Sequence, residues 1–203
     1  MIVQSEIHSS LKQRKLEDLL ELPVVVRVNK FDETGAKEFT EAMGRASATT
    51  QKVIPVLIDS YGGQVYSLLS MIDTIKASTK PVATIVMGKA MSCGAVLFTC
   101  GKEGMRYMGK NATLMIHDVS SIAFGKVEDI KADVKEAERL NLEIYRIMES
   151  NIGKPEGYLW GMVKEKCRVD WYLTPEEALE HNLANHLRIP SLQVKVNVEM
   201  SFG

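Results

Sequence analysis

Residues 53–63 of the 203-residue chain read VIPVLIDSYGG, and this stretch decides the fold. The segment 53–59 is an apolar run of strand length, which is typical of a strand buried on both faces of a helix-covered sheet. Two glycines follow at once. Residues 64–77 then carry an apolar stripe at helical spacing, formed by Val65, Leu68, Leu69, Ile72 and Ile75. The order strand, glycine turn, helix predicts an α/β domain.

The same pattern recurs further along the chain. VATIVM at 82–87 predicts a second buried strand, GKAMSCGA predicts a glycine-bearing turn, and the residues through Cys100 predict a short apolar helix. Further strands are expected over 24–28, 105–108, 113–116, 169–173 and 193–199, and helices over 11–22, 34–48, 127–148, 156–166 and from Pro175 onward. The last helix begins with Thr174-Pro175-Glu176-Glu177, a capping box with proline at the first helical position.

We expect one domain over residues 1–203. It comprises an N-terminal segment with the first helix (1–22), a helical projection at about 120–165 and a tail at 188–203. The apolar run at 82–100 has the length of a membrane span, but it carries Lys89 near its centre, where a charge costs roughly 2.5–3.5 kcal/mol. A buried strand, turn and helix explain this run better, so no membrane partner is expected.

Composition excludes several classes of protein. Apolar residues make up 45% and charged residues 25%, which excludes a disordered chain. The net charge of −1 disfavours a nucleic-acid binder. The three cysteines, Cys93, Cys100 and Cys167, form no CxxC pair or zinc spacing, so we expect neither a disulfide framework nor a metal site. Together with an N-terminus that shows no signal peptide, this favours the cytoplasm.

Ser92 is the first candidate for chemistry. It follows a predicted buried strand at the start of a predicted helix, where unpaired backbone N–H groups point outward. A hydroxyl at that position can meet a substrate while the N–H groups face an oxyanion. The alternative is a helix-capping serine, which is a common role.

Three more positions join Ser92 as candidates. Gly62 and Gly63 could present amides to an anion, although a simple tight turn is the alternative. His117 ends a predicted buried strand and is the best-placed general base, against the alternative of an ordinary core or surface histidine. Asp170 precedes two aromatic residues and could partner a histidine, against the alternative of a surface aspartate. Taken together, Ser92, His117 and Asp170 form a serine-hydrolase set.

Four segments then resemble the Clp protease proteolytic subunit family, ClpP. They are SYGGQVYSLLSMIDTIK (60–76), VATIVMGKAMSCGAVLFTCG (82–101), NATLMIHD (111–118) and VDWYLTPEEALEHNLANHL (169–187), within a resemblance that covers about residues 15–187. The four occur in the family's order and with suitable spacing. The resemblance implies the ClpP/crotonase-like α/β fold, with 120–165 as a projecting handle.

The resemblance also implies roles for individual residues. Ser92 corresponds to the nucleophile, His117 to the general base and Asp170 to the residue that orients the imidazole, while the amides of Gly63 and Cys93 correspond to the oxyanion hole. It implies an ATP-independent peptidase subunit that needs no cofactor and cleaves unfolded proteins inside a homo-oligomeric heptameric ring, usually stacked to fourteen. An AAA+ Clp ATPase would feed the ring.

Several positions differ from the family pattern. Tyr61 stands where the family usually has proline, Asp118-Val119 replaces Gln-Pro after the histidine, and Cys93 replaces methionine. Asp118 is expected to add a charge beside the base. These differences indicate a divergent member, of bacterial, phage or organellar type.

Three rival functions remain open at this point. A crotonase-type acyl-CoA enzyme shares the strand–GG–helix pattern and the amide oxyanion hole, but it needs no Ser/His/Asp set. A Ser–Lys peptidase would use a lysine base such as Lys89 or Lys110. A catalytically silent ring subunit would keep only the assembly function.

Overall fold

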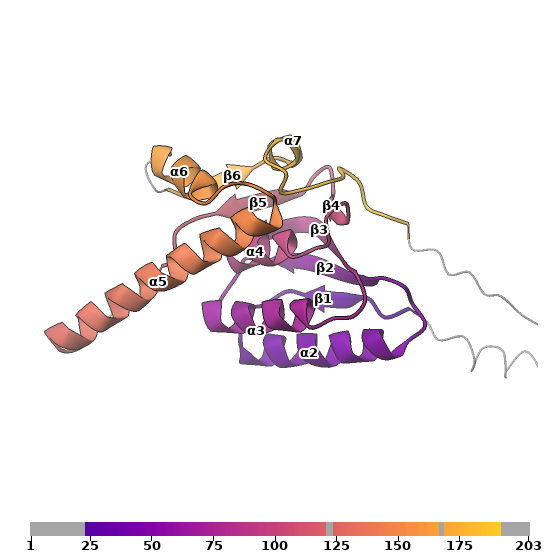
Figure 1. Cartoon of the computed structure of the whole chain (residues 1–203), viewed down its shortest axis with the longest axis horizontal. Coiled ribbons are helices and arrows are strands. Elements are labelled where there is room, and N and C mark those ends of the chain that lie inside the picture. Colours follow the sequence, from indigo (N-terminus) through magenta and orange to yellow (C-terminus); the bar gives the residue numbers. More distant parts are fainter. Residues whose placement is uncertain (1–22, 121–123, 167–168, 192–203) are drawn as a thin grey trace, which may run out of the picture.

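The computed structural model describes residues 23–120, 124–166 and 169–191 (Figure 1). Its elements are β1 (Val26–Val28), α2 (Glu33–Ala48), β2 (Ile54–Ser60), α3 (Val65–Lys76), β3 (Val82–Met91), α4 (Cys93–Thr99), β4 (Arg106–Met108), β5 (Thr113–Ile116), α5 (Val127–Asn151), α6 (Tyr158–Glu165), β6 (Trp171–Leu173) and α7 (Pro175–Glu180). The predicted α/β class is confirmed. The helix expected at 11–22, the strand expected at 193–199 and Cys167 lie outside the described residues.

One mixed sheet organises the domain. Its strand order is β1-β2-β3-β5-β6, with β4 also paired to β3. Strands β1, β2, β3 and β5 run parallel, whereas β6 runs antiparallel to β5. The carboxyl ends of parallel strands meet at one edge of a sheet, which is where sites gather in α/β folds. The segments that follow β2, β3 and β5 therefore converge on one edge.

Strand β3 corrects one expectation. The predicted strand at 82–87 does not turn at Gly88 but continues to Met91, so the expected glycine turn is part of the strand. Its first half pairs with β4 and its second half with β5. Against β2 the register shifts between Ile58 and Ser60, which marks an irregularity at that level. Gly88 has φ +86°, and a Cβ there would lie 3.1 Å from Asp59 Oδ1, so this position favours glycine.

The core lies between the sheet and the helices packed on it. The inward residues of β2 are fully buried, while Leu57 is half-buried and Asp59 is exposed, so the second face is less covered than the sequence predicts. The capping box at the start of α7 is confirmed, with Thr174 and Glu177 exchanging side-chain to backbone hydrogen bonds. Helix α5 extends beyond the sheet in Figure 1 and ends just before Gly153.

Candidate active site

Ser92 sits at the junction of β3 and α4 in an unusual backbone conformation. Its φ of +53° and ψ of −121° make it one of only two non-glycine residues with positive φ in the part of the chain that the structure describes. Such conformations are costly for residues with a Cβ and cluster at functional sites. The Ser92 side chain makes no capping hydrogen bond to α4. The alternative of a helix-capping serine therefore finds no support in the structure.

The two-glycine turn after β2 lies directly against Ser92. Gly62 has φ +104°, and a Cβ built on it would lie 2.8 Å from Ser92 Cβ and 3.3 Å from Cys93 N. A Cβ on Gly63 would collide with the backbone of Phe31. Both positions therefore require glycine: a side chain at 62 would push the turn away from Ser92, and one at 63 would push it away from Phe31.

The amides assigned to the oxyanion hole belong to these two turns. Cys93 is the first residue of α4, where backbone N–H groups have no partner within the helix. Cys93 Sγ also donates a hydrogen bond to Gly63 O at 3.2 Å, which ties the two turns together. Burial raises the pKa of the Cys93 thiol, which keeps the proton needed for this bond.

Strand register brings His117 and Asp170 together. Ile116 at the end of β5 pairs with Trp171 at the start of β6, so the next residues outward on the two strands are His117 and Asp170. His117 Nδ1 lies 3.6 Å from Asp170 Oδ1, with side chains 24% and 49% exposed. This distance is within ion-pair range and slightly beyond hydrogen-bond range.

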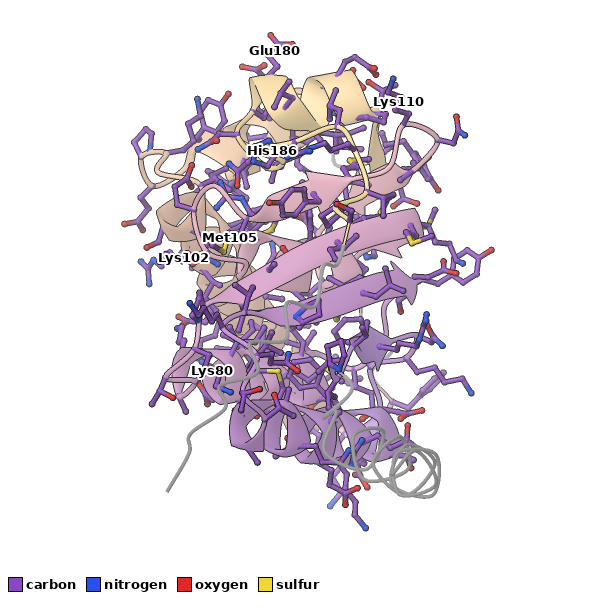
Figure 2. All side chains as sticks on the ribbon, turned by 90° about the vertical axis from the view of Figure 1, so that its right-hand side faces the viewer. Lys80, Lys102, Met105, Lys110, Glu180 and His186 are labelled. Atoms are coloured by element: carbon purple, nitrogen blue, oxygen red, sulfur yellow. The ribbon has the colours of Figure 1, made fainter. Side chains whose placement is uncertain are left out.

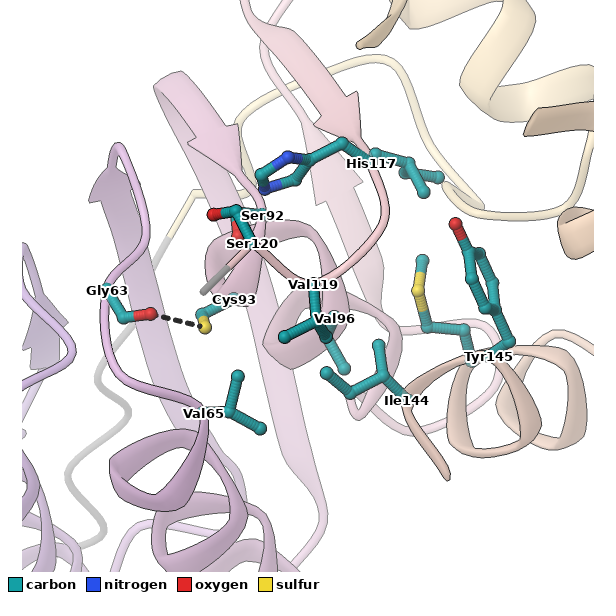
Figure 3. Close-up of a pocket in the computed structure, with 12 residues that line it drawn as sticks. Gly63, Val65, Ser92, Cys93, Val96, His117, Val119, Ser120, Ile144 and Tyr145 are labelled. Atoms are coloured by element: carbon teal, nitrogen blue, oxygen red, sulfur yellow. Dashed lines mark hydrogen bonds between the residues drawn. The ribbon is translucent and has the colours of Figure 1, made fainter. Parts of the chain in front are cut away.

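A small cavity of about 50 Å³ lies at this edge of the sheet. Ser92, His117, Ser120, Gly63 and Cys93 line its polar side, and Figure 3 shows the imidazole of His117 pointing toward Ser92 and Ser120. The remaining lining residues are mainly apolar, with Val65, Val96, Ile116, Val119, Ile144, Tyr145 and Met148. The cavity therefore offers a hydroxyl and an imidazole beside an apolar wall.

Asp170 does not line this cavity and reaches it only through His117. Ser120 does line it, and sequence reasoning missed this residue because it belongs to no regular element. Asp118 was expected to add a charge beside the general base, but its carboxylate is bonded to helix α5. Its carboxylate accepts hydrogen bonds from Tyr145 and Asn141 on α5.

The lysines that a Ser–Lys peptidase would need are poorly placed. Lys89 Nζ forms an ion pair with Asp59 Oδ1 at 2.8 Å, and this hydrogen bond raises the pKa of Lys89. A lysine base must instead be neutral at working pH, which requires a lowered pKa. Neither Lys89 nor Lys110 is among the residues that line the cavity.

Within residues 23–120, 124–166 and 169–191, no group of three His, Cys, Asp or Glu side chains is arranged to hold a metal ion. In the same ranges, no helix combines the length and apolar character needed to cross a bilayer.

The sequence is similar to known proteins of one family. The family model described as Clp protease matches residues 8–189. The chain is also 32% identical over 141 residues to the ATP-dependent Clp protease proteolytic subunit of Deinococcus radiodurans, an alignment that covers 70% of this chain and 67% of the relative.

Proposed function

This chain belongs to the Clp protease family, and on that premise we propose that it hydrolyses peptide bonds of unfolded proteins through Ser92, His117 and Asp170. One observation carries the proposal. Ser92 and His117, from separate strand ends, line one cavity beside a two-glycine turn, and Asp170 stands next to the imidazole. This arrangement supports a serine hydrolase, in which a hydroxyl, an imidazole and a carboxylate act in that order.

The proposed reaction proceeds through an acyl-enzyme. Ser92 Oγ attacks the substrate carbonyl carbon while His117 Nε2 accepts the hydroxyl proton, and Asp170 orients the ring from Nδ1. The amides of Gly63 and Cys93 hold the oxyanion, and one such donor is typically worth about 3–4 kcal/mol. His117 then gives its proton to the departing amine. Water repeats the sequence on the ester and restores Ser92.

The apolar wall of the cavity supports an expectation about the substrate. Val65, Ile144 and Met148 would surround the side chain that precedes the cleaved bond, so a medium-sized apolar residue should fit best. The substrate backbone would lie extended beside the site, which leaves the other side chains loosely selected.

The assembly is also part of the proposal. We propose a homo-oligomeric heptameric ring, stacked to fourteen, with an AAA+ Clp ATPase as partner and the cytoplasm as the compartment. Helix α5 supports a contact with a second copy, because it extends beyond the sheet and exposes Val127, Val134 and Leu142 (Figure 1). The relative's description as the proteolytic subunit of an ATP-dependent protease supports the ATPase.

The test compares two serine variants. Ser92→Ala should abolish cleavage of a short fluorogenic peptide without ATP, whereas Ser78→Ala should cleave at the wild-type rate. Ser78 precedes β3, whereas Ser92 follows it, so the control serine lies at the opposite end of this strand. Ser78 donates a hydrogen bond to the backbone oxygen of Lys80, which Figure 2 labels. Wild-type rates in Ser92→Ala would refute the assignment. Wild-type protein with no peptidase activity would favour the silent subunit, or the acyl-CoA enzyme if it processed a thioester.

A further inference from the structure

We propose that Asp118, Asn141 and Tyr145 form a clamp that positions the general base by fastening its segment to helix α5. The inference rests on the proposed function, since it assigns these three residues a task within that site. It concerns a position where the chain differs from its family pattern: Asp118 directly follows His117. The three residues act on His117 through the chain that follows it, so they are positioning residues.

Three hydrogen bonds build the clamp. Tyr145 Oη donates to Asp118 Oδ1 at 2.9 Å, and Asn141 Nδ2 donates to the same oxygen at 3.2 Å. Asn141 Oδ1 in turn accepts from the backbone N–H of Val119 at 3.0 Å. One side-chain amide thus holds both a carboxylate and the adjacent main chain, which fixes the direction of residues 118–119.

On helix α5, the clamp residue Tyr145 is held in a buried position. Tyr145 is 3% exposed, and Ile144 and Met148 beside it on the same helix are also buried. A tyrosine ring packed this tightly has little freedom, so its hydroxyl presents a fixed donor. Val119 packs against the hydrophobic core and lines the cavity that holds His117. The clamp therefore links the buried part of α5 to the wall of the site.

The clamp holds a segment that follows β5 and has no secondary structure of its own. Residues 117–120 belong to no helix or strand. Asp170, which faces the ring of His117, is half-exposed, and its Oδ1 lies 3.6 Å from His117 Nδ1, which is beyond hydrogen-bond range. Catalysis depends on placement of the base to within a fraction of an ångström, and an error of about 1 Å can cost about a hundredfold in rate. Loss of the clamp should therefore appear in the chemical step.

Two tyrosine variants make a matched test. Tyr145→Phe removes only the hydroxyl that donates to Asp118 at 2.9 Å. Tyr158→Phe removes a hydroxyl on α6 that makes a bond of similar length, 2.8 Å, with His181 Nδ1. We expect Tyr145→Phe to lower kcat for peptide hydrolysis between about tenfold and a hundredfold with KM within about twofold. The control should keep both constants. Labelling of Ser92 by a fluorophosphonate should slow by the same factor as kcat.

A second pair separates geometry from charge. Asp118→Asn keeps an oxygen that accepts from Tyr145, whereas Asp118→Leu keeps none. If the clamp acts through these hydrogen bonds, Asp118→Asn should keep most of the peptidase activity that Asp118→Leu loses. If both variants lose activity equally, the charge of Asp118 matters rather than its bonds, and the clamp is wrong.

The remaining outcomes are also decisive. Equal kcat and equal labelling rates in wild type and Tyr145→Phe would overturn the clamp while leaving the proposed function standing, provided that Ser92→Ala is inactive. A change in KM alone would assign Tyr145 to substrate binding and would also overturn it. If the wild-type protein is not labelled at Ser92, the proposed function and the clamp both fall.

Discussion

Gly62→Ala is the substitution whose effect the structure defines most sharply. The new Cβ would lie 2.8 Å from Ser92 Cβ and 2.9 Å from Met91 O. Non-bonded carbons prefer at least about 3.5 Å, so the turn must retreat by roughly 0.7 Å. Oxyanion donors work only within about 2.7–3.1 Å of the charge, and loss of one costs about a hundredfold to a thousandfold in kcat. We expect a loss of that size.

Gly104→Ala is the matched control for this change. Gly104 also has a positive φ, +78°, but no atom lies within 4 Å of its Cβ position. Both variants carry the backbone cost of about 1–2 kcal/mol for an L-residue in this region, so both should unfold at lower temperature. Only Gly62→Ala should lose peptidase activity. Equal activities, measured well below both unfolding temperatures, would refute the view that the glycine turn and Ser92 must touch.

The pair His117 and Asp170 should show a graded effect in steady-state kinetics. Asp170 acts only through His117, so Asp170→Ala should cost less in kcat/KM than His117→Ala, which should lose about 10²–10⁴; the reverse order would contradict the assigned roles. Burial raises the pKa of Cys93, so the native thiol should resist iodoacetamide at pH 7 while urea-unfolded protein reacts, and mass spectrometry showing rapid native labelling would count against that. Thr174→Ala should lower the free energy of unfolding by about 1 kcal/mol, whereas Thr174→Ser should not. The hydrogen bond from the Thr174 amide lowers the pKa of Glu177, so the stability it contributes is present at neutral pH and lost as the pH falls; denaturation curves of wild type and Glu177→Gln should converge below about pH 4, and a gap that widens there would be inconsistent.

Local sequence patterns predicted the main elements well. The apolar run at 53–59 and the glycines after it became β2 and the turn beside Ser92, because strand burial and positive φ leave strong local signals. The capping box at Thr174 is equally local. Family resemblance supplied the roles of Ser92, His117 and Asp170, and these roles stay predictions.

Other features depend on contacts between distant segments and left no local signal. Strand β3 continues past Gly88 because residues 89–91 pair with β5, whereas the local sequence predicts a turn there. Ser120 reaches the cavity only because the segment after β5 folds back toward Ser92. The direction of the Asp118 carboxylate is set by Tyr145, 27 residues further along the chain.

The most direct measurement is the site of reaction with a fluorophosphonate, mapped by mass spectrometry on the full-length protein. The proposed mechanism predicts one adduct per chain, on Ser92, formed far more slowly in His117→Ala. An adduct on Ser120, or labelling of Ser92 that does not depend on His117, would contradict it.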